Sequence, residues 1–290
     1  MGYKNNKSKV KSQKSKVIIF FGLFLIIIFF LYRNIISSVF LKGQERVNIV
    51  FYGADSFYLS LSNTGVNYLL KIPTDTKILV PGGYGWYRNG ALGKLVFLEK
   101  KPEIIKKAYS GATSSFVDLY FYTTGKVYYQ EDEKNLNTPK ISSIIFSSSN
   151  ANFLDRLILF FKILNKNKSD YRVIKINKIF NQENFNKDYQ GIFYKKNYRD
   201  FMPTVQIFYK KSYSTAYFLS QIIEGEGIKV VDLSQDENLN DNKCKIITKE
   251  INLVSKALAF YFNCNLEKGE TLVSDIILKL ESLEKDWSVK

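Results

Sequence analysis

The side chains of this 290-residue chain that could do chemistry are carboxylates, lysines, arginines and hydroxyl groups, because the sequence contains no histidine. The absence of histidine excludes Ser-His-Asp and Cys-His catalysis and the usual zinc sites. Any reaction must therefore use acidic or basic side chains, hydroxyl groups, or a hard cation such as Mg²⁺, which prefers oxygen ligands.

A glycine-rich segment follows Pro81 and contains Gly82, Gly83 and Gly85. Glycine adopts positive φ at little steric cost, so these three positions predict a sharply turning backbone. Such a segment is either a plain surface turn or a loop whose backbone approaches a ligand closely. The sequence alone supports both interpretations.

An apolar stretch near the N-terminus is a candidate membrane anchor, and it would decide on which side of a membrane the rest of the chain lies. Residues 17–32 read VIIFFGLFLIIIFFLY and carry no charge. As a helix this stretch covers about 24 Å, less than the hydrocarbon core of a bilayer, so we expect the span to continue to residue 41. Its length and the absence of a small-residue cleavage site favour an uncleaved anchor over the alternative, a cleaved signal peptide.

Residues 1–16 form a lysine-rich tail with six lysines and no acidic residue. A basic flank of this kind is retained in the cytoplasm, which predicts a cytoplasmic N-terminus and an extracytoplasmic C-terminal part. The two cysteines, Cys244 and Cys264, would then lie outside, where disulfides persist. We interpret them as a disulfide; the alternative is two buried free thiols.

The exported part is expected to remain basic, because the formal charge of +15 falls to +9 without the six lysines of the tail. A basic exterior attracts acidic partners such as anionic lipid head groups or phosphate-bearing wall polymers. The alternative explanation is a codon bias that enriches lysine. The sequence contains no nucleic-acid-binding motif, so nucleic acid is not an expected partner.

Strands and helices alternate from residue 42 to residue 181, which predicts an α/β domain. The expected strands are 47–52, 67–73 and 116–122, with 75–80 extending the second strand into a hairpin. The expected helices are 102–109 and 152–164.

Residues 182–203 are rich in Asn, Lys and Tyr without a clear period, and we interpret them as a linker. The last segment, 204–290, shows an ordered β-α-β-β-α-β pattern and predicts a small α+β domain. Its expected strands and helices are 204–209, 214–224, 228–233, 245–248, 251–262 and 274–280, in that order. A glycine pair, Gly225 and Gly227, stands where the first helix should end with positive φ.

Several strings in these two regions are similar to the LytR-CpsA-Psr family of envelope proteins. The string VNIVFYGADSF (47–57) resembles the family's opening strand, which Gly-x-Asp-Ser-Arg follows. KIPTDT (71–76) resembles its Ser-Ile-Pro-Arg-Asp-Thr, and YGWYRNGAL (84–92) stands where the family has Lys-Ile-Asn-Ala-Ala-Tyr. This likeness covers roughly residues 46 to 175, and 200–287 resembles the C-terminal domain that is often fused to the family.

The resemblance implies a fold and a reaction. Active members are α/β/α sandwiches that hold a polyprenyl-pyrophosphate-linked glycopolymer and transfer it to the cell wall, with arginines on the pyrophosphate and aspartates on Mg²⁺. By this match Asp55 and Asp75 would be catalytic and metal-binding, and Arg88 would be the basic residue of the third motif. Lys71 is a candidate ligand-binding residue, and so are Gly82, Gly83 and Gly85 if the glycine-rich segment is a loop that approaches a ligand.

The chain departs from the family pattern at two arginine positions, which are Phe57 and Thr74 here. The family's Arg-Ser-Asp-Thr string is also absent, unless 54–56 is its remnant. Lys71 could replace one lost charge, although an ammonium lacks the forked geometry of a guanidinium. We therefore expect an extracytoplasmic envelope protein with weak or no phosphotransferase activity. The alternatives are a non-catalytic binding or scaffold protein and a purely structural anchored protein. For Asp55, Asp75 and Arg88 the alternative roles are turn caps and a surface charge.

Overall fold

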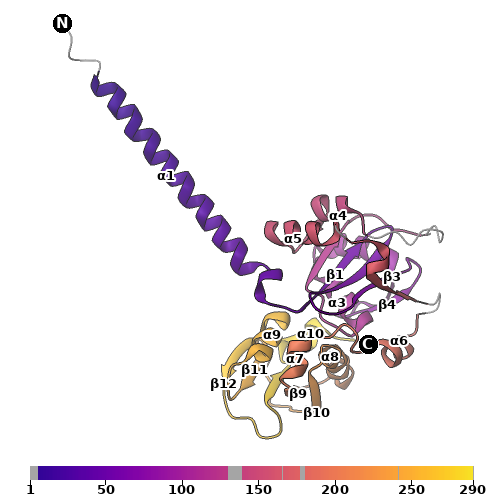
Figure 1. The fold of residues 1–290 in the computed structure, drawn as a ribbon. Coiled ribbons are helices and arrows are strands. Elements are labelled where there is room, and N and C mark those ends of the chain that lie inside the picture. Colours follow the sequence, from indigo (N-terminus) through magenta and orange to yellow (C-terminus); the bar gives the residue numbers. More distant parts are fainter. Residues whose placement is uncertain (1–5, 130–138, 165, 177–179, 241, 290) are drawn as a thin grey trace.

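The computed structural model describes residues 6–129, 139–164, 166–176, 180–240 and 242–289 (Figure 1). It is a mixed α/β protein in which a long N-terminal helix, α1 (Asn6–Ser37), projects from two packed sheet domains. The helix begins inside the segment predicted as a separate tail. Its window Phe20–Ser37 has a mean hydropathy of 2.1 over 18 residues, so it is long and apolar enough to cross a membrane.

A six-stranded mixed sheet of order β7-β6-β1-β2-β3-β8 forms the centre of the N-terminal domain. Strands β1, β2 and β3 form an antiparallel meander, while β6 is parallel to β1 and β8 is parallel to β3. The strands are β1 (Arg46–Tyr52), β2 (Ser56–Ser62), β3 (Asn67–Ile72), β6 (Leu119–Tyr122), β7 (Ser148–Ser149) and β8 (Tyr171–Lys175).

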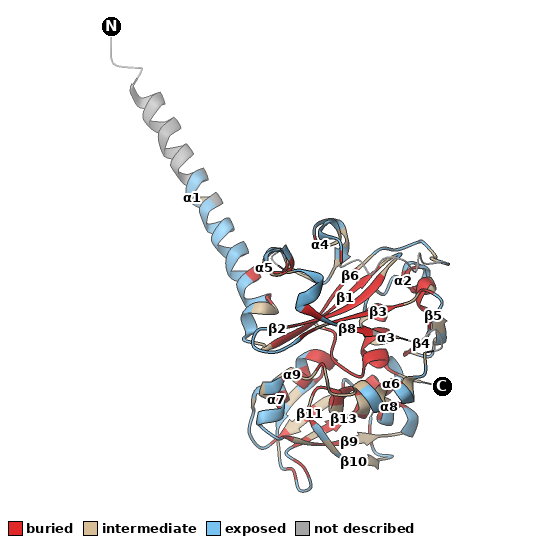
Figure 2. Cartoon of the chain, turned by 45° about the vertical axis from the view of Figure 1, so that its right-hand side comes forward, coloured by how far each residue is buried: buried red, intermediate tan, exposed pale blue. Residues whose placement is uncertain are grey.

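Helices cover both faces of this sheet, because β1 buries side chains alternately on its two sides. Ile49 and Phe51 pack with Ile144 of α4 (Ile141–Phe146) and Leu159 of α5 (Phe153–Leu164). Val50 packs on the opposite face against the other helices. Those helices are α2 (Leu92–Glu99), α3 (Glu103–Thr113) and α6 (Gln182–Tyr189). Figure 2 shows the buried strands between the two helical layers.

The glycine-rich segment is the turn of a small hairpin between β4 (Lys77–Val80) and β5 (Gly85–Arg88). Gly82, Gly83 and Gly85 have φ values of 91°, 84° and 77°, as the glycine spacing predicts. The hairpin partner of 77–80 is therefore the following strand, whereas the sequence predicted an extension of the preceding one. Short 3-10 helices complete the domain at Phe40–Lys42, Asn89–Ala91 and Lys168–Asp170.

The C-terminal domain is a five-stranded sheet of order β10-β9-β13-β11-β12 with α8 (Tyr213–Gly225) and α9 (Leu253–Phe262). Ser212 caps α8 by accepting a hydrogen bond from the Thr215 amide, and Asn252 begins α9 in a capping box with Ser255. The strands are β9 (Thr204–Tyr209), β10 (Lys229–Gln235), β11 (Lys245–Thr248), β12 (Asn265–Lys268) and β13 (Ile276–Lys279). The sequence analysis missed β12 and α10 (Ser282–Asp286).

Cys244 and Cys264 are joined by a disulfide, with 4.8 Å between their Cα atoms. Both sulfurs are buried in the C-terminal core. The bond links the strand β11 side of this domain to the end of α9, and it closes a loop of 20 residues.

The segment predicted as a linker is an ordered part of the structure. Within 182–203 lie α6 and a short helix α7 (Lys196–Asp200), and the side chains of Phe193, Lys195 and Tyr198 are buried. The described residues between the two domains are therefore ordered, which the lack of a clear period did not predict. They are held by partners distant in sequence, which a local period does not reveal.

Candidate functional site

Asp55 and Lys71 form an ion pair at one end of the N-terminal sheet, with 3.1 Å between Oδ1 and Nζ. The antiparallel register of β2 and β3 pairs Phe57 with Lys71, and Asp55 lies just before β2. The two side chains are 36% and 14% exposed. Lys71 therefore balances the charge of Asp55, the residue that the sequence analysis assigned to metal and catalysis.

A pocket of about 210 Å³ opens beside Asp55, between the ends of β1 and β6 and helix α4. Its walls are largely aromatic, and Asp55 and Lys140 bring one charge of each sign. The aromatic lining consists of Phe51, Tyr52, Phe57, Phe121 and Tyr128. The pocket suits a narrow apolar group with a polar end.

Tyr52 fixes the wall of this pocket through its hydroxyl group. The hydroxyl donates to the Gly90 carbonyl (3.1 Å) and accepts from the Gly93 amide (2.7 Å), so it holds the start of α2 against β1. Burial raises the pKa of Tyr52 to about 12, which keeps the phenol neutral. Tyr128 is placed at the same wall by a 2.9 Å contact between its hydroxyl and that of Thr123. Neither tyrosine was predicted from the sequence as a site residue.

Asp75 and Arg88 lie outside the lining of this pocket, and both are exposed. Their neighbours show how the chain is arranged there. Buried Asn89 donates from Nδ2 to the Ile72 carbonyl (2.9 Å) and accepts from the Tyr109 hydroxyl (2.7 Å), which ties β5 to the end of β3. Among the predicted catalytic residues, only Asp55 lines the pocket.

The predicted ligand-binding glycines Gly82 and Gly83 already donate their amides to a protein group. Both amides point to the Ser288 carbonyl, at 2.9 and 3.1 Å. This turn therefore contacts the C-terminal end of the chain. Gly85 has open space where a Cβ would lie.

The charged residues at the pocket do not fit a site for Mg²⁺. Asp55 is paired with Lys71, and Asp75 is absent from the lining. Nowhere in the described part of the chain do three or more His, Cys, Asp or Glu side chains gather closely enough to hold a metal ion. We derive no metal-dependent step.

The two residues that stand at the family's arginine positions are buried. Phe57 is 3% exposed and belongs to the core between the sheet and α4. Thr74 is 2% exposed, and its carbonyl accepts the Gly90 amide at 2.7 Å. An arginine at either position would need a rearranged end of the sheet, so these departures belong to the local packing.

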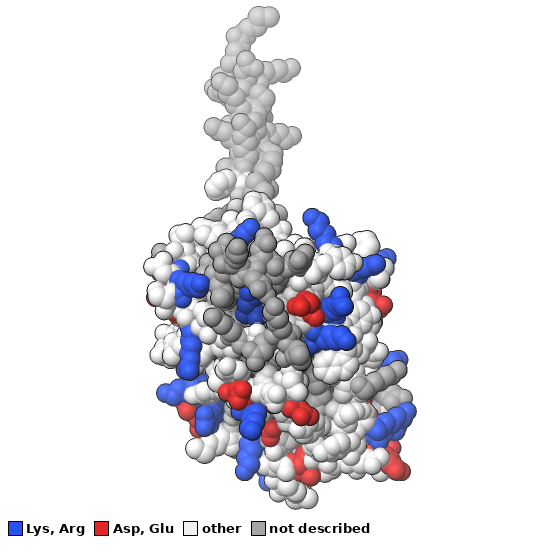
Figure 3. Space-filling model, turned by 90° about the vertical axis from the view of Figure 1, so that its right-hand side faces the viewer, with Lys and Arg blue, Asp and Glu red and all other residues white. Residues whose placement is uncertain are grey.

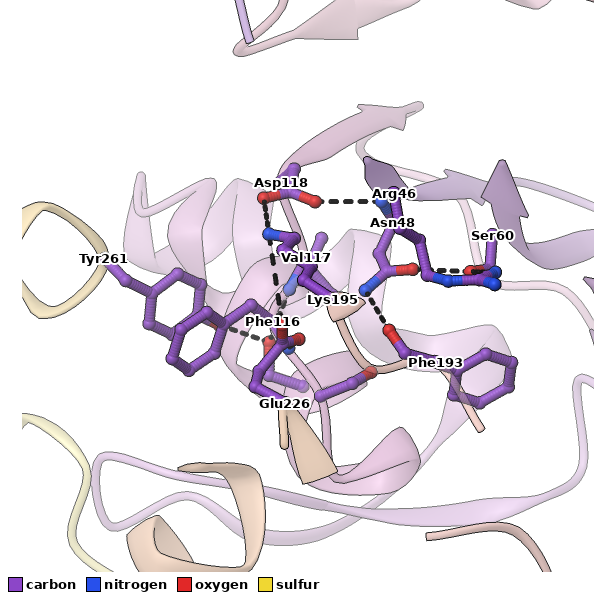
Figure 4. A network of polar contacts seen from close by, with 12 residues as sticks. Arg46, Asn48, Ser60, Phe116, Val117, Asp118, Phe193, Lys195, Glu226 and Tyr261 are labelled. Atoms are coloured by element: carbon purple, nitrogen blue, oxygen red, sulfur yellow. Dashed lines mark hydrogen bonds and ion pairs between the residues drawn. The ribbon is translucent and has the colours of Figure 1, made fainter. Parts of the chain in front are cut away.

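A network of buried polar contacts joins the two domains (Figure 4). Lys195, which precedes α7, places Nζ 2.7 Å from Oδ1 of Asp118 and 4.0 Å from Oε2 of Glu226. Glu226 follows α8 and accepts the Phe116 amide through Oε1. Lys195 and Glu226 are 1% and 0% exposed, so the contacts lie in the interior.

The network continues into the N-terminal sheet through the other oxygen of Asp118. That oxygen accepts the Asn48 amide at 2.8 Å, and Asn48 Oδ1 accepts the Ser60 hydroxyl at 2.7 Å. Arg46 reaches Ser60 Oγ (2.8 Å) and the Tyr194 carbonyl (3.1 Å). Each domain therefore depends on buried polar partners supplied by the other and by the segment between them.

Burial and neighbouring charges have opposite effects on the pKa values of Lys195 and Glu226. Burial alone would lower the pKa of Lys195, but attraction to Asp118 and Glu226 outweighs it and raises the pKa above its usual value. Burial also raises the pKa of Glu226 to about 8, against the opposing effect of Lys195. Asp118 is the nearer ion-pair partner of Lys195, at 2.7 Å against 4.0 Å for Glu226, and burial makes Glu226 easier to protonate than an exposed glutamate.

Aromatic contacts complete the junction between the domains. Phe116 stacks on Tyr261 with 3.9 Å between ring centroids, and the Tyr261 hydroxyl is 2.5 Å from Ser110 Oγ on α3. Lys106 donates to the Tyr261 carbonyl at 2.9 Å. Helix α3 therefore packs on the N-terminal sheet with one side and on the C-terminal domain with the other.

The basic excess of the chain is not gathered on the face drawn in Figure 3. Lys and Arg side chains there lie scattered among uncharged ones, with Asp and Glu side chains between them (Figure 3).

Comparisons with known proteins add little. No protein-family model matches the chain, and no curated protein matches it. A solved structure, the transcriptional regulator yvhJ from Bacillus subtilis, is similar over 47% of this chain and 84% of that chain, with a TM-score of 0.32 and 10% sequence identity. A similarity of this size carries no argument about fold or function.

Proposed function

We propose that this chain is a membrane-anchored, extracytoplasmic envelope protein that binds a lipid-linked glycan precursor and transfers it weakly or not at all. The proposed domain order, a membrane anchor followed by an α/β domain and a small α+β domain, resembles that of the LytR-CpsA-Psr proteins. The observation that carries the proposal is the aromatic pocket at the end of the sheet, where Lys71 balances the charge of Asp55.

The pocket favours binding of an apolar chain. Aromatic walls gain free energy by covering apolar surface, about 25 cal/mol per Å² removed from water. The volume of about 210 Å³ is below the roughly 300 to 1,000 Å³ of sites that enclose a whole small molecule. It therefore holds one segment of a prenyl chain next to its polar end, while the rest of the lipid lies outside.

The charges at the pocket disfavour transfer. A departing pyrophosphate needs several cations or fixed donors, but Asp55, Lys71 and Lys140 together carry only one net positive charge. Two missing charge-assisted contacts, at about 1.5 to 3 kcal/mol each, would slow transfer by roughly a hundredfold or more. Lipid binding is therefore favoured over phosphotransferase activity.

Binding is tested with the full chain in bilayer nanodiscs and a fluorescent polyprenyl pyrophosphate. Ser143→Phe should fill the pocket and abolish binding, because Ser143 lines it. Ser142→Phe is the matched control, since Ser142 is the exposed neighbour outside the lining. Equal binding by both variants, or no binding by the unmodified protein, would overturn the proposal.

Transfer is tested separately with a labelled lipid-linked polymer, peptidoglycan and Mg²⁺. We expect little product, and the same amount from Asp55→Asn. Robust product that disappears in Asp55→Asn would instead establish a phosphotransferase with Asp55 in the catalytic site.

A further inference from the structure

Helices α4 and α5 expose a continuous apolar face on their outer side, away from the sheet. On α5, exposed side chains recur at intervals of four, four and three residues, which places them on one face of the helix. Helix α4 adds Ile145 and Phe146, the latter 84% exposed. We call this set the α4–α5 face: Ile145, Phe146, Phe153, Leu157, Phe161 and Leu164.

The exposure of these apolar side chains does not result from loose packing of the two helices. The opposite side of the pair is well buried, with Ile144, Leu159 and Ile163 in the core of the sheet. The helices are therefore firmly seated and apolar on both sides. Apolar surface left over in this way marks a contact with another molecule or with a membrane.

The start of α5 is fixed to the outer end of the membrane-span candidate α1. Asp155, which is 1% exposed, accepts hydrogen bonds from the Ser38 hydroxyl (2.7 Å) and the Val39 amide (2.9 Å). Asn152 donates from Nδ2 to the Asn34 carbonyl (2.9 Å) and to Ser37 Oγ (2.8 Å). These contacts hold α5 at the level where the apolar window of α1 ends.

The arrangement of the elements agrees with this placement. In Figures 1 and 2, α5 and α4 lie beside the outer end of α1, while β10 lies at the opposite end of the molecule. The outer side of α3 is covered by the C-terminal domain, through Ser110 and Tyr261. The C-terminal domain therefore packs on the helical layer opposite the α4–α5 face.

The charges near this face suit a lipid surface. Asp155 is the only acidic residue in the two helices, and it is buried against α1. Basic residues are more numerous: α5 contains Arg156 and Lys162, Lys140 directly precedes α4, and Lys166 and Lys168 follow α5. Apolar residues with flanking lysines are typical of helices that lie in the interface of anionic membranes.

We propose that the α4–α5 face lies in the head-group region of the outer leaflet of the membrane that α1 crosses. The inference rests on α1 spanning the membrane and not on the lipid-linked ligand proposed above. The N-terminal sheet is then held close to the bilayer by two attachments, α1 and this face.

The test uses the full chain reconstituted in vesicles of phosphatidylglycerol and phosphatidylethanolamine, with one nitroxide label per protein. Labels are attached at Phe161→Cys and, as matched control, at Val231→Cys, another exposed apolar position, on β10. The two native cysteines are joined to each other in the structure and do not take the label. Power saturation then compares collisions with oxygen, which enters the bilayer, and with a water-soluble nickel chelate.

The label at Phe161 should collide more with oxygen than with nickel, and the label at Val231 should show the reverse. Nickel collisions at Phe161 equal to those at Val231 would overturn the proposal. Protection from both reagents would also overturn it, because the face would then contact protein. Spin-spin broadening that disappears on dilution with unlabelled chain would identify that protein as a second copy. Ile145→Cys repeats the measurement on α4.

Discussion

Lys195 and Asp118 form an ion pair in the interior of the protein, with 2.7 Å between Nζ and Oδ1 and 1% and 8% of their side chains exposed. The lysine belongs to the segment between the domains, and the aspartate directly precedes β6. The pair therefore helps to hold the two domains together and is not part of the candidate ligand site.

Removing the lysine should strongly destabilise the protein. Lys195→Met leaves Asp118 buried without its cation, and such a change costs about 3 to 5 kcal/mol. The measurement is the free energy of unfolding in urea. Lys196→Met is the control, because Lys196 is exposed one position further on. Adding Asp118→Asn to Lys195→Met should recover part of the loss, whereas equal losses at Lys195 and Lys196 would refute the assignment.

Stability should fall with rising pH because of Glu226. Its pKa in the folded state is raised to about 8 from 4.5, so the folded state binds the extra proton between these values. The free energy of unfolding therefore decreases as pH rises through this window, by a few kcal/mol in total, and the loss is complete above pH 8.

Glu226→Gln isolates this contribution, since the amide oxygen still accepts the Phe116 amide but does not ionise. The slope between pH 5 and 8 should be flatter in the variant than in the unmodified protein. Lys106 does not interfere, because its pKa is lowered from 10.5 to about 8 and its effect lies above that pH. Identical slopes would contradict the raised pKa of Glu226.

Gly225→Ala should weaken the junction of the two domains. A Cβ at Gly225 would lie 1.6 Å from the Ser114 carbonyl oxygen, so the backbones must separate. We expect a loss of about 1 to 3 kcal/mol or more in the free energy of unfolding, with faster proteolysis inside 182–203. Gly53→Ala serves as the control, because its Cβ would meet its nearest atom at 3.9 Å. A stable, protease-resistant Gly225→Ala protein would show that the junction adapts.

The Cys244–Cys264 disulfide should be present in protein purified without reductant. Mass spectrometry of non-reduced peptides should find the two cysteine peptides joined. Replacing both cysteines with alanine should cost about 3 kcal/mol, the entropy of closing a loop of 20 residues. Two free thiols in the isolated protein would refute the prediction.

The six lysines within residues 1–16, ahead of the apolar run, predict a cytoplasmic N-terminus and an extracytoplasmic C-terminal part. Protease added to intact cells should remove the domains and leave the N-terminal segment protected. A tag at the N-terminus and one at the C-terminus report the two sides independently. Protection of the C-terminal tag in intact cells, with cleavage after lysis, would reverse the assignment.

Much of the fold could be predicted where local pattern and packing agree. Helices α5, α8 and α9 carry apolar stripes at helical spacing, and their predicted ends lie close to the observed ones. Strand β2 was missed because Ser56 and Ser60 interrupt its apolar pattern. Both serines are fully buried, and Ser60 is satisfied by Asn48 on the neighbouring strand. A pattern of side-chain polarity does not show partners that only the sheet supplies.

The site was predictable only in part for the same reason. Asp55 stands at the pocket, but its pairing with Lys71 depends on the register of β2 and β3. The donation of the Gly82 and Gly83 amides to Ser288 depends on how the two domains dock. The aromatic lining of the pocket could not be predicted from the sequence, because Phe51 and Phe121 come from different strands that pair only in the folded sheet.

The polar contacts between the domains also affect the order in which parts of the chain can fold. Arg46 finds its carbonyl partner in Tyr194, 148 positions later, and Phe116 finds its carboxylate in Glu226, 110 positions later. Ribosomes deliver the chain N-terminus first, so Arg46 has no Tyr194 partner until residue 194 has emerged, and the Phe116 amide has no Glu226 partner until residue 226 has emerged. A chain truncated before residue 226 therefore lacks the carboxyl group that accepts the buried Phe116 amide, so the first domain depends on the second for this contact.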